Sequence, residues 1–324
     1  MKDKAAQSRL NKSRSGRDLT QGDILPHILR LGSPMVIGIL AIVSTTLADT
    51  YFLALLGTDE LAAISFAFTI SFAIFSLIIG LGVGMSSALS RTIGGGRIED
   101  GRHLVLHGLL VTALISFILT VLGLLFQPYL FRLLGADEAL LPLILDYMNI
   151  WFFGLVFVTI PIVGNAAMRA SGDAMTPGLI MILVAVLNLG LDPILIFGYF
   201  GLPALGMQGA ALASVISYAV SMVIALYILA VRKKLLQLDS LALGDFQNSA
   251  RRILHVGVPA GLSNMLQPLS QTFIVALLAT VSTEAVAGFG VAARIQSLVL
   301  VPLMALATGL TPIIGQNWGA QEFT

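Results

Sequence analysis

The stretch Ser171–Gly198, SGDAMTPGLIMILVAVLNLGLDPILIFG, decides the fold class. From Thr176 onward it is apolar except for Asn188 and Asp192. About 20 residues at 1.5 Å each cross the hydrocarbon core of a bilayer, so the stretch is long enough to span a membrane as a helix. The two polar residues are four apart and therefore share one face of that helix. A carboxylate inside a span costs roughly 2.5–3.5 kcal/mol, which makes Asp192 a functional candidate.

The composition of the whole chain indicates an integral membrane protein. Of 324 residues, 57% are hydrophobic and 11% are charged, whereas soluble domains average about 25% charged residues. The mean hydropathy is +0.93. Cysteine is absent, which excludes disulfides and thiolate chemistry. The polar start of the chain has no apolar core before Ile24, so it does not read as a cleavable signal peptide.

The motifs of common enzymes are missing from the sequence. It has no H-E-x-x-H, no G-x-x-x-x-G-K-[ST] and no G-x-G-x-x-G, and its four histidines show no ligand spacing. We therefore expect no enzyme activity, no cofactor and no nucleic-acid partner, and the expected partners are small organic substrates and membrane lipids. The sequence carries no prediction of oligomeric state.

Eight long apolar segments follow the polar start, and they are too long and too uniformly apolar for the strands of a barrel. The sequence therefore predicts an all-α polytopic membrane protein. The segments are Ile28–Leu56, Leu61–Ser90, Leu104–Phe126, Leu140–Ala167, Thr176–Gly198, Ala204–Val231, Leu254–Val281 and Gly288–Ile314.

Basic residues set the expected orientation, because cytoplasmic loops are enriched in Lys and Arg. With eight spans, all of the 18 Lys and Arg except Arg132 and Arg294 fall on the side of the N-terminus. We therefore expect a cytoplasmic N-terminus and insertion in the plasma membrane.

The chain also repeats itself after a shift of 225 residues. The shift brings the Gly32-x-Pro34 start onto Gly257-x-Pro259 and the turn Thr58-Asp59 onto Thr283-Glu284. The repeating unit is six helices long, as in transporters built from parallel repeats. We expect a disordered cytoplasmic tail (1–23), a six-helix bundle (24–231), a cytoplasmic linker (232–252) and the first two helices of a second bundle (253–324). On this interpretation the chain is truncated after its eighth helix.

These features together resemble the multidrug and toxic compound extrusion (MATE) family, in particular its DinF-like branch. The resemblance rests on the Gly32-Ser-Pro opening, Asp49 in TTLADTYFLALLGTDELAA, the Arg169–Asp173 run RASGD, and the Asn188-Leu-Gly-Leu-Asp192-Pro box. It covers the whole chain after the tail and implies two six-helix bundles facing each other around a central cavity.

Depth along the helices predicts which polar groups meet. Asp49 lies about 10 Å, Asp192 about 9 Å and Tyr147 about 12 Å from the outer ends of their segments, at helical rise. Asp49, Asp192, Asn188 and Tyr147 should therefore share the outer half of the first bundle. Such a carboxylate pair can bind a proton, or Na⁺ with Asn188 as a neutral ligand, and the resemblance implies the same. No other metal site is expected. The alternative is that the acids reach the interface and are solvated, and that Tyr147 belongs to the interfacial aromatic belt.

Other polar positions are weaker candidates. Asn165, near the inner end of its helix, is a candidate for the cavity lining or for helix-end hydrogen bonding. Asn264, Gln267 and Gln271 share one helix face, and either line the cavity or bond a neighbouring helix. Pro34 is expected to kink the first helix, the alternative being a proline at a helix start.

The predicted function is secondary antiport. The protein would export organic, often cationic, amphiphilic compounds such as drugs and toxins in exchange for H⁺ or Na⁺. The alternative is a lipid-linked oligosaccharide flippase of the same superfamily, for which several inward-facing Arg or Lys would be expected.

Overall fold

The computed structural model describes residues 19–236, 245–279 and 282–322, and within these ranges the chain is helical, without strands. The all-α prediction is therefore confirmed. Of the tail expected over residues 1–23, residues 1–18 lie outside the described residues. The elements in order are α2 (Ile24–Ala54), α3 (Thr58–Gly94), α4 (Ile98–Leu133), α5 (Leu141–Phe153), α6 (Leu155–Ala170), α7 (Met175–Phe197), the 3₁₀ turn η1 (Tyr199–Gly201), α8 (Met207–Tyr227), the π-helical turn η2 (Ile228–Arg232), α9 (Phe246–Ala279) and α10 (Thr283–Ala320).

Six of the described helices are long and apolar enough to cross a membrane, or seven if the bent pair α5–α6 counts as one span. Each of the eight predicted segments coincides with one helix or with one pair of consecutive helical elements. Helix α9 is not among these candidates, which were sought only among the described residues.

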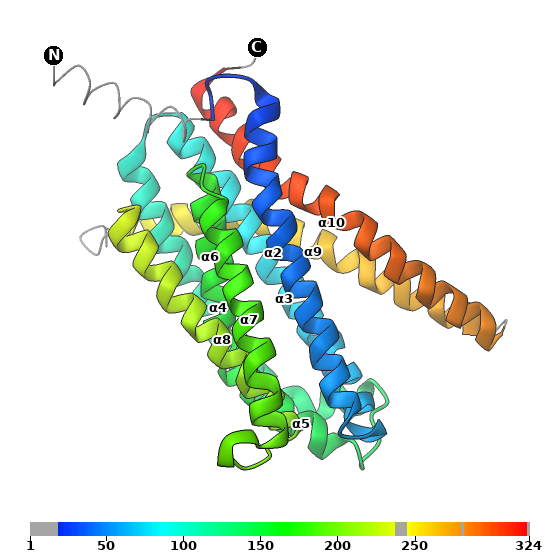
Figure 1. Ribbon diagram of the computed structural model, residues 1–324. Helices are drawn as coiled ribbons and strands as arrows, with labels where there is room; N and C mark the ends of the chain where they lie inside the picture. The colour runs from blue at the N-terminus through cyan, green and yellow to red at the C-terminus, as the bar shows by residue number, and fades with distance from the viewer. Residues whose placement is uncertain (1–18, 237–244, 280–281, 323–324) are drawn as a thin grey trace.

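Helices α2 to α8 gather in one bundle, with α5 at one end of it (Figure 1). The hairpin of α9 and α10 crosses this bundle obliquely and extends beyond it on one side (Figure 1). The ends of the hairpin nearest to α3 pack closely against the bundle, and their contacts follow from the internal repeat.

Glycines from the two repeats meet in equivalent pairs. A Cβ on Gly84 of α3 would lie 2.9 Å from the backbone nitrogen of Gly257 in α9, and a Cβ on Gly309 of α10 would lie 3.5 Å from that of Gly32 in α2. The shift of 225 residues exchanges these two contacts, and it also carries Thr58 onto Thr283, each the first residue of its helix. The repeat predicted from the sequence is thus present as a repeat of helices and of their packing.

A break at Gly154 separates α5 from α6, and the two helices meet at 50°. The break leaves the carbonyl oxygen of Phe152 without its helical donor. The hydroxyl of Thr120 in α4 donates a hydrogen bond of 2.8 Å to this oxygen. Glycine is required at the break, because a Cβ there would lie 2.1 Å from the side chain of Val215 in α8. The predicted uninterrupted segment Leu140–Ala167 therefore bends, and the bend directs α5 across the end of the bundle.

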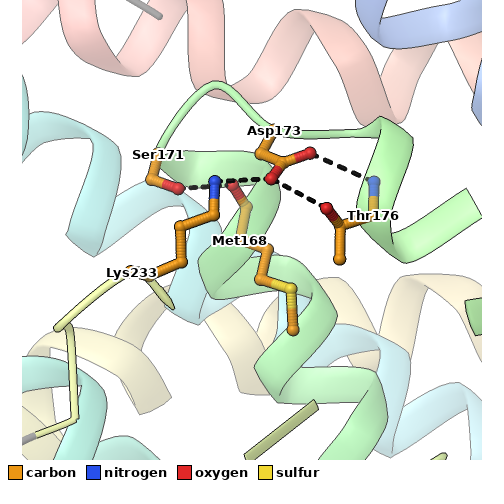
Figure 2. Close-up of polar contacts among 5 residues, drawn as sticks. All are labelled: Met168, Ser171, Asp173, Thr176 and Lys233. Atoms are coloured by element: carbon orange, nitrogen blue, oxygen red, sulfur yellow. Dashed lines mark hydrogen bonds and ion pairs between the residues drawn. The ribbon is translucent and has the colours of Figure 1, made fainter. Parts of the chain in front are cut away.

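An ion pair between Lys233 and Asp173 lies at the opposite end of the bundle (Figure 2). Lys233, after η2, places its Nζ 2.5 Å from Oδ2 of Asp173, and the two side chains are only 8% and 17% exposed. Asp173 also accepts hydrogen bonds from the backbone N–H and the hydroxyl of Thr176, at 3.1 and 2.9 Å, and so caps the start of α7. The turn between α6 and α7 is thereby fixed to the end of the α8–η2 helix.

Candidate ion and substrate site

A cavity of about 250 Å³ opens between helices of the bundle, at the half that contains the C-terminal end of α2. Helices α2, α3, α5, α6, α7 and α8 each contribute side chains to it. The lining residues are Ile42, Thr45, Thr46, Asp49, Phe68, Ser71, Phe72, Phe75, Tyr147, Trp151, Val158, Val184, Asn188, Ser214, Val215 and Tyr218.

The side-chain amide of Asn188 lies between two carboxyl groups. One end of the amide is 3.3 Å from Oδ1 of Asp192 and 3.2 Å from the Ser214 hydroxyl, and the other end is 3.0 Å from Oδ1 of Asp49. Asn188 and Asp192 are fully buried, whereas Asp49 is partly exposed to the cavity. Asp49, Asn188 and Tyr147 line the cavity, and Asp192 lies behind them.

This arrangement has a simple chemical consequence. An amide has one donating end and one accepting end, whereas an ionised carboxylate only accepts. Whichever way Asn188 is turned, its oxygen faces a carboxyl oxygen of Asp49 or Asp192. That contact is favourable when the carboxyl carries a proton or when a cation lies between the oxygens. The geometry therefore suits one bound positive charge.

The oxygens present also fit a small hard cation, which prefers carboxylate, carbonyl and hydroxyl ligands. Oδ2 of Asp192 is buried without a hydrogen-bond partner, so one ligand atom is not committed to the protein. Within the described residues no cluster of three or more His, Cys, Asp or Glu side chains suits a metal ion. A multivalent metal site is therefore not indicated in that part of the chain.

The local sequence explains how α7 presents this pair. Asn188 and Asp192 are one turn apart in an unbroken helix, Met175–Phe197. Pro193 lacks a backbone N–H and leaves the carbonyl of Leu189 without its helical donor, so the backbone near the pair is more polar than in a regular helix. Gly198, in the left-handed conformation at φ 76°, ends the helix.

Aromatic rings form much of the rest of the cavity wall. Phe75 and Trp151 contact each other edge-on with ring centroids 5.9 Å apart. Tyr147 is buried, as are most side chains on its face of α5. The sequence interpretation did not include Ser214 and Tyr218, which are four apart on α8 and reach the cavity together. Their spacing was the available signal, but it does not distinguish them from the other small and aromatic residues of that helix.

The remaining candidates lie elsewhere. Asn165 is buried in α6 outside the cavity lining, and its Oδ1 has no hydrogen-bond partner. On α9, Asn264 and Gln267 are exposed and Gln271 is half-buried, and none of the three lines the cavity. Helix α2 continues through Pro34 without a break. It lies close to α7 at this point, since a Cβ on Gly178 of α7 would lie 2.8 Å from the carbonyl oxygen of Pro34.

Comparison with known proteins agrees with this architecture. The family model MatE matches residues 34–194 and 259–324, which include Asp49, Asn188 and Asp192. The chain belongs to the MatE family. The apolar helices and the family membership indicate an integral membrane protein, and the proteins that the MatE chain resembles are transporters rather than enzymes.

Two relatives of this MatE chain differ in what their names say they carry. A protein of Shewanella oneidensis described as an FAD transporter is 40% identical over 295 residues, which are 91% of this chain and 65% of the relative. A probable multidrug resistance protein of Bacillus subtilis, YoeA, is 31% identical over 83% of this chain and 58% of its own length. The chain thus spans about three fifths of the length of these relatives.

A solved structure matches the MatE chain in three dimensions. It is a MOP superfamily transporter from Pyrococcus furiosus, described as having a binding pocket of reverse polarity that suggests a different function. It has a TM-score of 0.85 and 32% identity, and the match covers 95% of this chain and 68% of that one.

Proposed function

We propose that the chain is the ion-coupling part of a secondary antiporter of the DinF-like branch, which exports organic, often cationic, amphiphilic compounds in exchange for H⁺ or Na⁺. The observation that carries the proposal is the amide of Asn188 between Asp49 and Asp192, which calls for one proton or cation at that point. Entry of the ion would satisfy the pair, and its loss would leave a carboxylate in the cavity wall that attracts a cationic substrate.

The proposal includes an orientation and a division of the chain. The cavity half of the bundle would face outward in the plasma membrane, and the N-terminus would lie in the cytoplasm. Residues 24–231 would form the first bundle, 232–252 the linker and 253–324 the start of the second bundle. Distribution of the basic residues supports the orientation, and the equivalent glycine contacts support the division.

A flavin dinucleotide is the second candidate substrate, because the relative at 40% identity is described as an FAD transporter. The aromatic wall suits a flat ring system. Against it, the described cavity lining contains no Lys or Arg to pair with the diphosphate. The same lack of basic side chains disfavours the lipid-linked oligosaccharide flippase, whose substrate also carries a diphosphate.

One transport assay distinguishes these substrates. A chimera would continue this chain after Thr324 with the corresponding remainder of the Shewanella oneidensis relative, and it would be reconstituted in liposomes under an imposed H⁺ or Na⁺ gradient. We expect gradient-driven transport of ethidium, with loss of that transport in the Asp49→Asn chimera. Transport of FAD that persists in the Asp49→Asn chimera, without ethidium transport, would replace the cationic substrate by the flavin.

A further inference from the structure

A short non-helical segment precedes α2 at the end of the bundle remote from the cavity. Its first described residue, Leu19, has a side chain only 3% exposed. Asp49 lies 25 residues after the start of α2, or about 38 Å along the helix, so this segment and the ion site are at opposite ends of the bundle. The side chains clustered with Leu19 are Leu31, Met35, Ala174, Ala305 and Ile313.

Side chains at the end of α10 form hydrogen bonds with both backbone polar groups of Leu19. Its N–H donates to Oε1 of Gln316 at 3.2 Å, and its carbonyl accepts from Nδ2 of Asn317 at 3.0 Å. Gln316 is itself buried, and its Nε2 donates to the carbonyl of Ala170 at 2.7 Å. One side chain of α10 therefore joins the segment before α2 to the last turn of α6.

The same part of α10 is wedged against α3. A Cβ on Gly94 would lie 2.0 Å from the carbonyl oxygen of Gln316, and a Cβ on Gly319 would lie 2.2 Å from that of Arg91. Helices α2, α3, α6 and α10 thus converge at this end, with Leu19 over the junction. These contacts hold α3 and α10 together at the end of the bundle remote from the cavity.

The internal repeat contains an equivalent contact, which joins α3 of the first copy to the start of the second copy. Thr92 of α3 is the residue that the shift of 225 carries onto Asn317, and its hydroxyl accepts a hydrogen bond of 2.7 Å from Arg252 of α9. The second helix of each repeat, α3 or α10, therefore forms a hydrogen bond with the start of the other repeat. The two differ in one respect: Arg252 is inside a helix, whereas Leu19 is in non-helical chain, followed by Gly22 at φ +92°. The Leu19 contact can therefore release without unwinding a helix.

We propose that residues 19–23 form a releasable strap, which holds this end of the bundle closed through Leu19, Gln316 and Asn317. Release of Leu19 removes one of the two hydrogen bonds of Gln316 and leaves only its bond to Ala170 between that side chain and α6. Alternating access requires such an opening on the side opposite the cavity. The role of the strap in transport rests on the proposed function. The closure of this end does not, because it can be measured without a substrate or an ion gradient.

The test measures access to Ala174, which is buried beside Leu19. The chain contains no cysteine, so Ala174→Cys provides a single label site for a membrane-impermeant maleimide added from the side that this end faces. We expect slow labelling in that background and roughly tenfold faster labelling when Leu19→Ala or Gln316→Ala is added, since a buried leucine, or the two hydrogen bonds of Gln316, changes an opening equilibrium by about that factor.

Gln321→Ala is the matched control, because Gln321 is an exposed glutamine at the end of the same helix. It should leave the labelling rate unchanged. Thermal unfolding of Leu19→Ala in detergent checks that the bundle remains folded, because Leu19 is buried against α2 and α10. Unchanged labelling in Leu19→Ala would overturn the strap. Loss of ethidium transport in the Asp49→Asn chimera does not bear on this result, so the two proposals can fail separately.

Discussion

Asp173 lies in the turn between α6 and α7, outside the membrane helices. Lys233 and Thr176 bind it, and both members of the ion pair are largely buried (Figure 2). Removing one partner leaves the other charge without compensation. We expect Asp173→Asn to lower the free energy of unfolding by roughly 3 kcal/mol, measured by thermal unfolding in detergent.

A surface pair provides the comparison. Arg132 and Glu138 are 2.8 Å apart but 50% and 74% exposed, so Glu138→Gln should lower the free energy of unfolding far less than Asp173→Asn does. Equal losses for Asp173→Asn and Glu138→Gln would show that burial of the Lys233 pair contributes nothing.

The same carboxylate gives a pH dependence. Burial alone would raise the pKa of Asp173, but the bonds from Lys233 and Thr176 outweigh burial and hold the pKa below its usual 3.8. A lowered folded-state pKa stabilises the protein at any pH above the unfolded value and loses that stabilisation as pH falls through the folded value. The melting temperatures of wild type and Asp173→Asn should therefore differ at neutral pH and converge below about pH 4. A difference that grows on acidification would contradict the assignment.

At the scale of helices, the close approach of α3 and α9 depends on glycine. A Cβ on Gly84 would lie 2.2 Å from the carbonyl oxygen of Ile253, a backbone atom that cannot rotate away. We expect Gly84→Ala to destabilise the protein by about 1–3 kcal/mol through displacement of α9, as seen in thermal unfolding.

Gly190 on α7 is the control, because nothing lies within 4 Å of a Cβ there. Gly190→Ala should be neutral or stabilise by up to about 1 kcal/mol, owing to the better helix propensity of alanine. If both alanine variants behave alike, the α3–α9 packing described here is wrong.

Periodicity and length were sufficient to predict the helices but not their interruptions. Apolar runs show where helices cross a membrane, and Thr283, the start of α10, follows from Thr58 by the repeat. The break at Gly154 depends on Thr120 and Val215, which are distant in sequence. No local pattern could have specified it.

The same distinction applies to the site. Polar residues are few in apolar helices, and their depth along each helix predicted that Asp49, Asn188, Asp192 and Tyr147 would lie together. In the structure Asp49, Asn188 and Tyr147 line one cavity, and Asp192 lies behind it. Ser214 could not be found in this way, since small hydroxyl residues are common in membrane helices and bond their own backbone. The position of the Asn188 amide between the two acids is purely tertiary information.

At the scale of the molecule, the basic residues predict the topology. Reporter fusions after Gly96 and Asp239 should report cytoplasm, and fusions after Gly57 and Gly201 should report the outside. Asp239 lies outside the described residues, so its fusion tests the sequence prediction alone. One fusion on the wrong side would change the number of spans that precede that fusion site.

The central claim is that Asp49, Asn188 and Asp192 form one ion-coupling site. The most direct test is ion-driven efflux of ethidium by the chimera carrying Asp49→Asn or Asp192→Asn, because Asn keeps the volume and hydrogen bonding of Asp but cannot titrate. Asp137→Asn, in the turn between α4 and α5, is the control and should transport at the wild-type rate. We predict that each of the two site variants folds, reaches the membrane and loses efflux under an imposed H⁺ or Na⁺ gradient. Wild-type efflux in both would contradict the account.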